Sequence, residues 1–463
     1  MALRRPLVML IAVAATLTVS AAGALACAVH MPLSPSSMTP LDALFAPSAT
    51  AATPRAPARY RLRAVGHADP AAGYNGDVWA HRGHAYLSSW GGPACPSDGV
   101  RVYSLANPRR PVLVSTFASD ELEPALKSTW TEKTIVQHVA TPAFTGELAV
   151  TSVQSCKQGA FRGFALYDVT DSRAPRTLAL VRTEPRGSHE LWLQPRSGAA
   201  YVYTAIIDSE LRSSPDHDPS SRTARTPGRP DFRVYDVTSP TAPVEVGSWG
   251  VWRDRGVYPH PADPAEGGGI TYVVHSVTSN AAGTRAYLSY WDLGTVILDT
   301  TNPAAPRYLG RTPDTEAAHS AALGNSGKLL IETHETAGGV PHFFDVSNPA
   351  RPRRLGSLRI AAAGRPAPFG ARSLMNGVHD ADVRGKRAFF SWYTQGVVAA
   401  DITRPARPRV IAQWLPPVGA DEHGALCQSG ACRAVWGVAT SGDYVLASDL
   451  VTGLWVLKLE RPK

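Results

Sequence analysis

The chain has 463 residues, of which 39 are glycine, 39 are proline and only 18% carry a charge. This composition is typical of β structure with many turns and offers no long amphipathic segments for a helical bundle. The formal charge is +8, but the arginines lie among prolines without interleaved aromatic residues, which argues against a nucleic-acid surface.

The first 26 residues show the features of a secretory signal peptide in their usual order. Arg4 and Arg5 precede an apolar run over residues 6–22, and the small residues of a cleavage site follow at 24–26. We therefore expect an extracytoplasmic protein, whether periplasmic, cell-surface or secreted.

Cys27 directly follows this segment. The chain holds five cysteines, so pairing of the other four in an oxidising compartment leaves Cys27 over. An odd cysteine here favours lipidation, although Ala24 stands where a lipobox usually has leucine; plain cleavage after Ala26 is the alternative. Residues 27–57 are rich in Pro, Ser, Thr and Ala and are predicted to form a disordered linker before a folded domain over 58–463. Contact with a membrane is expected only through such an anchor.

One pattern occurs six times in the body of the chain. Its clearest copy is FFDVSNPARPRRLGSL, residues 343–358. The other five copies share its order of apolar run, turn with proline and second apolar run: VYSLANPRRPVLVSTF from Val102, LYDVTDSRAPRTLALV from Leu166, VYDVTSPTAPVEVGSW from Val234, ILDTTNPAAPRYLGRT from Ile297 and AADITRPARPRVIAQW from Ala399. An internal repeat of this length indicates one supersecondary unit used many times.

The turn residues explain the pattern. In five copies the apolar run ends at an aspartate, namely Asp168, Asp236, Asp299, Asp345 and Asp401. Its carboxylate can accept hydrogen bonds from the backbone N–H groups of the turn. A second proline then opens the next strand, and because proline has no N–H to donate, that strand is expected at a sheet edge.

Two more strands precede each copy, as in HAYLSSW from His84 and RAFFSWY from Arg387, so each repeat has four strands. Four-stranded units repeated around an axis form a β-propeller. Seven such units can be counted, and the last, Gly453–Glu460, lacks its outer strand, which Ala58–Val65 resembles. We predict an all-β, seven-bladed propeller of four-stranded blades, closed by the N-terminal strand.

The motifs DVSNPARP, DVTSPTAP and DTTNPAAP resemble the LVIVD-repeat family of secreted and cell-surface bacterial and archaeal proteins, which are taken to be β-propellers. The resemblance covers most of residues 60–460; Ser104 and Lys458 depart from the aspartate in the first and last units. It implies fold and location but no particular activity. The leading functional hypothesis is a binding module at the cell envelope, whose partner is a protein, a glycan or an envelope component.

Histidines recur near the start of five predicted inner strands: His138, His189, His275, His319 and His379. Asp77 and Trp436 take the equivalent place in the first and last units. Imidazoles converging on the axis would suit a transition metal such as Cu, Zn or Fe, and would make the protein a secreted metalloenzyme with oxidoreductase chemistry as one option. The resemblance to selenium-binding and methanethiol oxidase propellers is architectural only. The alternative is that each histidine recurs with its repeat and packs between blades or around a polar channel mouth.

The segment ETHE, Glu332–Glu335, ends the second strand of the fifth unit. Strand alternation places Glu332 and His334 on one side, with Glu335 near the loops, and a Glu–His pair there could bind a ligand or act as acid and base. No nucleophile motif accompanies them, so we expect a solvated pair.

The four remaining cysteines suggest two disulfides. Cys95 and Cys156 lie in equivalent loops of neighbouring units, and Cys427 and Cys432 close a short loop. The longest insertions, at about 119–132, 209–230, 251–269, 359–374 and 416–431, are expected around one mouth of the ring.

Overall fold

The computed structural model describes residues 60–461, apart from 70–72, 92–94, 96, 222, 260–271, 314–316, 337, 361–375, 425 and 428–429. The predicted signal peptide, the linker over 27–57 and the lipidation candidate Cys27 lie outside these residues.

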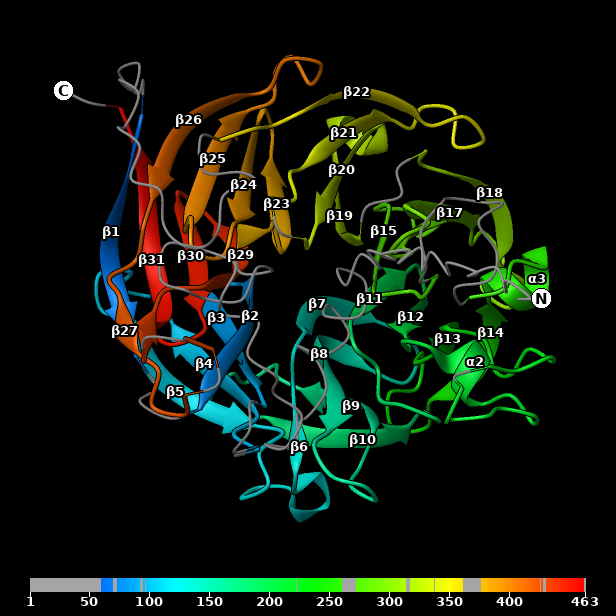
Figure 1. The fold of residues 1–463 in the computed structure, drawn as a ribbon. Helices are drawn as coiled ribbons and strands as arrows, with labels where there is room; N and C mark the ends of the chain where they lie inside the picture. The colour runs from blue at the N-terminus through cyan, green and yellow to red at the C-terminus, as the bar shows by residue number, and fades with distance from the viewer. Residues whose placement is uncertain are drawn as a thin grey trace, which may run out of the picture.

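Seven four-stranded antiparallel sheets surround one axis, which confirms the predicted β-propeller (Figure 1). Blade one contains β2 (Tyr74–His81), β3 (His84–Trp90), β4 (Val100–Ser104) and β5 (Val112–Phe117). Blade two contains β7 (Thr134–Ala140), β8 (Thr145–Ser155), β9 (Gly163–Asp168) and β10 (Arg176–Arg182), and the short β6 (Thr129–Trp130) pairs with β8. Blade three contains β11 (Leu191–Arg196), β12 (Ala199–Ala205), β13 (Phe232–Asp236) and β14 (Val244–Trp249).

The remaining blades have the same order from axis to rim. Blade four contains β15 (Ser276–Ser279), β16 (Arg285–Ser289), β17 (Thr295–Asp299) and β18 (Arg307–Arg311). Blade five contains β19 (Ala318–Gly324), β20 (Leu329–His334), β21 (His342–Asp345) and β22 (Arg353–Ser357). Blade six contains β23 (Asp380–Arg384), β24 (Arg387–Ser391), β25 (Val397–Asp401) and β26 (Arg409–Trp414). Blade seven contains β29 (Val435–Ser441), β30 (Tyr444–Asp449), β31 (Gly453–Glu460) and β1 (Arg61–Ala68).

Blade seven joins the two ends of the described chain. Strand β1 pairs antiparallel with β31, from Arg61 opposite Glu460 to Ala68 opposite Leu454, and Figure 1 shows the blue strand beside the red one. Leu62 is buried in the cluster that also holds Leu457. The predicted closure by the N-terminal strand is therefore confirmed, and it covers an edge that would otherwise expose unpaired backbone groups.

The turn aspartates act as the sequence predicts. All five accept a hydrogen bond from the backbone N–H two residues later, over 2.8–3.0 Å. Asp299 also accepts one from Arg307 at 2.6 Å. Hydrogen bonds from Thr301, followed by that from Arg307, lower the pKa of Asp299 to about 2. These carboxylates hold the turns at the rim of blades two to six.

A glycine in the outer strand packs against the proline turn of the next blade. A Cβ placed on Gly310 of β18 would lie 2.3 Å from the carbonyl oxygen of Pro349. Equivalent close approaches occur at Gly66 with Pro108, Gly247 with Pro303 and Gly356 with Ala406. In these four blades the outer strand therefore supplies a glycine, and the next blade supplies the proline turn that it contacts. The contact of Gly66 with Pro108 joins blade seven to blade one in the same way.

Replacing Gly310 with alanine is expected to lower the free energy of unfolding by about 1–3 kcal/mol, because the new methyl group has no space beside the Pro349 carbonyl. Chemical denaturation measures the change. Ala179 follows the corresponding bulge in β10, so Ala179→Gly relieves no clash and should give no gain in stability. A neutral Gly310→Ala variant would contradict the tight contact.

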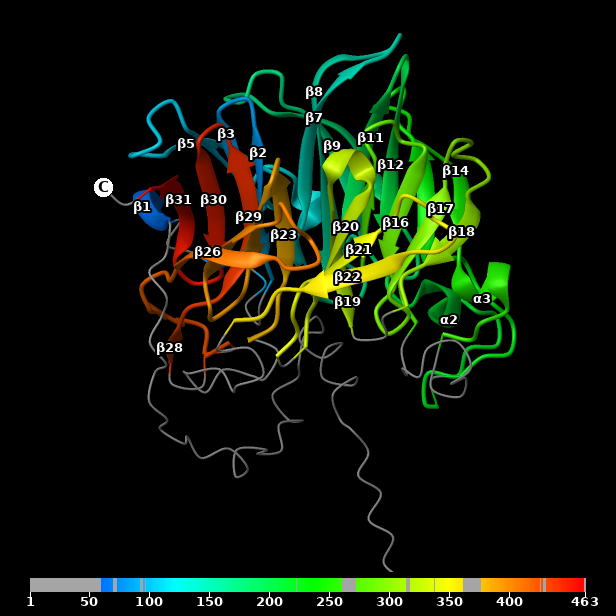
Figure 2. The same ribbon diagram turned by 90° about the horizontal axis from the view of Figure 1, so that it is seen from above.

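The two faces of the ring differ. The connections between blades and the loops between second and third strands lie on one side, together with α2 (Ser209–Arg212), α3 (Val251–Arg255), η3 (Pro124–Leu126), β27 (Gly419–Ala420) and β28 (Ala431–Cys432). Figure 2 shows α2, α3 and β28 on this side, here called the loop face. The turns between first and second strands, including η5 (Asn325–Gly327), form the opposite turn face. No helix of the described residues is long and apolar enough to cross a membrane.

Two disulfides lie on the loop face. Cys95 joins Cys156 across blades one and two with a Cα–Cα distance of 6.2 Å. Cys427 joins Cys432 with a Cα–Cα distance of 5.6 Å. The structure thus brings together the pairs that the sequence suggested.

Candidate metal centre

The inner strands begin at the loop face, and their first residues form a layer around the axis. Backbone hydrogen bonds hold these starting points in place: the N–H of His275 donates to Ser289 and that of His379 donates to Ser391, both at the end of a second strand. The layer contains one residue from each of blades two to seven, namely Glu132, His189, His275, His319, His379 and Trp436. We call these six residues the axial layer.

Neighbours in the axial layer touch one another in blade order. Glu132 Oε2 lies 2.8 Å from His189 Nδ1, and the Nε2 atoms of His189 and His275 are 2.9 Å apart. The ring centroids of His275 and His319 are 4.3 Å apart, and those of His319 and His379 are 4.1 Å apart. Since all four histidines are at most 2% exposed, the imidazoles form one buried cluster.

One backbone contact sets the protonation of His319. Its Nδ1 lies 2.7 Å from the carbonyl oxygen of His379, and because a carbonyl oxygen can only accept, Nδ1 must carry the proton. In the neutral ring Nε2 then has the lone pair. A backbone carbonyl that fixes the tautomer in this way is the usual outer partner of a metal-bound histidine.

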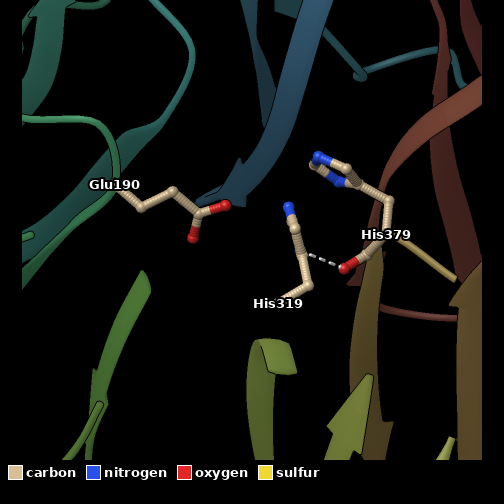
Figure 3. A group of neighbouring side chains, drawn as sticks. All are labelled: Glu190, His319 and His379. Atoms are coloured by element: carbon tan, nitrogen blue, oxygen red, sulfur yellow. Dashed lines mark hydrogen bonds between the residues drawn. The ribbon is translucent and has the colours of Figure 1, made fainter. Parts of the chain in front are cut away.

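His319 belongs to two groups whose potential ligand atoms all lie within 4.8 Å of one another. The first is His275, His319 and Glu335, in which Glu335 Oε2 lies 3.5 Å from His319 Nε2. The second is Glu190, His319 and His379. Figure 3 shows the Glu190 carboxylate directed toward the His319 ring, with His379 nearby. Imidazole and carboxylate ligands at about 2.0–2.2 Å from a metal are spaced about 3 Å apart, so modest movement would suffice for coordination.

Aromatic side chains surround the axial layer. Trp291 lies 4.9 Å from His275 between ring centroids, and Trp436 lies 4.2 Å from His379. The hydroxyl of Tyr393 donates to Glu335, and burial, with the charge of Glu335 adding to it, raises the pKa of Tyr393 well above its ordinary value. Such a shell keeps the site dry and holds the carboxylate in place, which increases the strength of electrostatic interactions inside it.

A second layer lies one residue deeper along the inner strands. The ammonium of Lys133 lies 2.5 Å from Asp77, 2.7 Å from Asp380 and 3.7 Å from Glu190. Burial opposes the charge of Lys133, but the three carboxylates outweigh burial and raise its pKa well above the ordinary value. We call these four residues the lysine layer.

The pKa values of the three carboxylates in the lysine layer shift in different directions. It raises the pKa of Glu190 well above its ordinary value and that of Asp77 to about 6, although Lys133 acts in the opposite direction on both. Burial acts on Asp380 in the same way, but the charge and hydrogen bond of Lys133 hold its pKa below the ordinary value. Lys133 therefore neutralises Asp380 most completely and Glu190 least.

Two of the residues that the sequence analysis placed beside the axial histidines do not lie in the axial layer. His138 lies toward the other end of β7, where its side chain is 49% exposed and its Nδ1 is 3.0 Å from Glu147, so Glu132 takes the axial place in blade two. Asp77 lies in the lysine layer, one residue deeper than assigned. Trp436 does contact the histidines, as a wall of the site.

Glu332 and His334 form a separate network between blades four and five. They lie on one side of β20, as alternation predicts, with His334 Nε2 2.9 Å from Glu332 Oε1. Both are fully buried, so the expectation of a solvated pair was wrong. Glu332 Oε2 accepts hydrogen bonds from Thr295 and Thr312. Glu332 and His334 also form a group of potential metal ligands with His342, away from the axis, while Glu335 belongs to the axial site.

Four residues of the two layers had no assignment from sequence: Glu132, Lys133, Glu190 and Asp380. The signal that could have found them is the repeat register. Once His189, His275, His319 and His379 are aligned, Glu132 falls on the same place in blade two. Lys133, Glu190 and Asp380 each fall one residue later. The presence of a histidine at 138 shifted that register by six residues.

The comparisons with known proteins support the fold. No protein-family model matches the chain, and a search of curated proteins gave no match. Among solved structures, the β-propeller domain of Cps50 (Swd1) from Myceliophteria thermophila matches with a TM-score of 0.51 and 11% identity, over 86% of this chain and 98% of that one. The match agrees with the seven-bladed β-propeller described above, and at this identity the likeness extends to the fold alone.

Proposed function

We propose that the protein is an extracytoplasmic metalloprotein that holds one transition-metal ion, Cu, Zn or Fe, in the axial layer. The carrying observation is His319, whose Nε2 bears a lone pair. His319 belongs to two groups whose potential ligand atoms lie within 4.8 Å of one another, one with His275 and Glu335 and one with Glu190 and His379. Neutral imidazole with carboxylate is a ligand set that these metals accept.

The surroundings of the ligands also favour a metal. Packing alone would be served by apolar residues, because ionisable groups are costly to bury. Here four histidines and two glutamates, Glu132 and Glu335, are at most 2% exposed within one cluster, and a divalent cation would compensate both carboxylates. A role in oxidoreductase chemistry requires copper or iron, because zinc does not change its oxidation state.

The location outside the cytoplasm is part of the proposal. Two disulfides fit an oxidising compartment, and the signal-like residues 1–26 and Cys27 agree with export, with or without a lipid anchor. Membership of the LVIVD-repeat family, proposed from the turn motifs, would give the same location. Fractionation of expressing cells checks it, and a cytoplasmic pool alone would contradict it.

A binding module at the envelope is the second candidate function. It is favoured by the concentration of long connections on the loop face, where rigid propellers present variable segments to partners. Its partner would be a protein, a glycan or an envelope component, and a structural metal in the axial layer is compatible with it.

Elemental analysis of the purified full chain tests the metal proposal. After loading of the chelator-treated protein with Cu, Zn or Fe and removal of excess metal, we expect about one ion per chain, which should stabilise the fold because the ion binds the native state only. Absence of stoichiometric metal with all three ions would leave only the binding module.

A further inference from the structure

An internal cavity of about 970 Å³ follows the axis below the two layers. Its lining includes Asp77, Lys133, Glu190 and Asp380 at one end and the residues 280–282 and 326–327 at the other. The latter are turns between first and second strands, and Ala281, Ala282 and Ser326 are exposed. The cavity therefore runs from a mouth on the turn face to a closed end at the lysine layer.

The charge of the cavity is opposite to that of the protein. Its lining holds four carboxylates, of Asp77, Glu190, Asp380 and Asp382, and one ammonium, of Lys133, a formal charge of −3. The whole chain has a formal charge of +8. A cleft lined by one sign of charge with protein walls focuses the electric field and concentrates ions of the other sign. The cavity thus attracts small cations, although the chain as a whole is positively charged.

Glu190 connects this cavity to the axial layer. It lines the closed end of the cavity and also belongs to the group with His319 and His379, as Figure 3 shows. It is 2% exposed, and its Oε1 has no hydrogen-bond partner in the described part of the chain. Lys133 is held mainly by Asp77 and Asp380, at 2.5 and 2.7 Å, and is 3.7 Å from Glu190. Among the carboxylates that line the cavity and have a hydrogen bond or ion pair with Lys133, the one grouped with two axial histidines is therefore also the one farthest from the ammonium.

We propose that the cavity is a cation-selective access chamber, through which divalent metal ions reach the axial histidines from the turn face, with Glu190 as the first ligand they meet. This inference rests on the proposed metal centre and adds the route and the charge selectivity. It also assigns a role to the turn face, although the long loops lie on the other side.

The test is the kinetics of copper binding to the metal-free full chain. Copper(II) quenches tryptophan fluorescence, and Trp436 and Trp291 both contact histidines of the axial layer. Thr278, half-buried in β15, lines the cavity between Ser276 and the turn at Asn280. In Thr278→Trp we expect association and dissociation to slow by the same factor, at least about 10-fold, with unchanged Kd, because a barrier on the route changes rates and leaves both end states alike. Val244→Trp, with Val244 58% exposed in outer strand β14, is the control of equal bulk.

Two further measurements test the role of charge in the cavity. In the wild-type chain the association rate should fall with rising ionic strength, because screening weakens the attraction. Asp382→Asn should slow association several-fold and reduce this salt dependence, and its side chain can still accept from the N–H of Thr440, as Asp382 does at 2.6 Å. Normal loading of a folded Thr278→Trp, or wild-type loading that is independent of salt, overturns the access chamber and leaves the metal centre standing. A wild-type chain that binds no copper overturns both.

Discussion

Replacement of His319 by alanine is expected to remove the bound metal, with a loss of affinity of at least about 100-fold. His319 is the one residue shared by the two candidate ligand groups at the axis, and its Nδ1 is committed to the backbone of His379, so no neighbour can replace its Nε2 without moving the inner strand. Loss of an outer partner alone typically costs 10–100-fold in metal affinity, and loss of a ligand should cost more. Metal content and competition with a chelator measure the effect.

His138→Ala is the matched control for this experiment. His138 is also on an inner strand, but it is half exposed and contacts Glu147 instead of the axial layer, so its removal should leave metal content unchanged. A wild-type protein with one metal ion per chain and a His319→Ala variant that keeps it would contradict the assigned site. Thermal stability of the metal-free forms separates the ligand role from packing, because a purely structural histidine would affect only the latter.

Replacement of Lys133 by alanine is expected to lower the free energy of unfolding by about 3–5 kcal/mol at pH 8, because removal of one partner leaves buried charges uncompensated. Asp77 and Asp380 lie within 2.7 Å of the Lys133 ammonium, and the three side chains are at most 13% exposed. Denaturant unfolding of the metal-free wild type and variant measures the difference. Arg384→Ala is a suitable control, because Arg384 is half exposed and its ion pair with Asp443 is 3.8 Å long.

The difference between wild type and Lys133→Ala should shrink as the pH is lowered to 5. Burial already raises the pKa of Glu190 well above its ordinary value and that of Asp77 to about 6 with Lys133 present, and without its charge both should rise further. A carboxyl group whose pKa is higher in the folded state binds more protons there, so the variant loses stability as pH rises through that range. The contribution of Lys133, whose folded pKa is raised, is fully present at both pH values. Equal differences at pH 5 and 8 would contradict this account.

Much of the candidate site was visible in the sequence, but its completion was not. The spacing of His189, His275, His319 and His379 with the repeat predicted that they meet at the axis, and the structure places them in contact. The assignment failed in blade two, where a histidine six residues away drew the register from Glu132 to His138. A repeat predicts which residues share a place only where its copies remain similar, and the turn aspartate and axial histidine are both absent from blade one.

The sequence by itself determined the architecture. Turn aspartates, prolines that restrict a strand to the edge, and a last repeat without an outer strand are local features whose physical consequences do not depend on distant residues, so seven blades and the closure by β1 followed from them. Tertiary structure alone decided the depth and partners of each ionisable group. Lys133 of blade two contacts Asp77 of blade one and Asp380 of blade six. Such contacts at the axis depend on strand tilt and register, which no single repeat specifies.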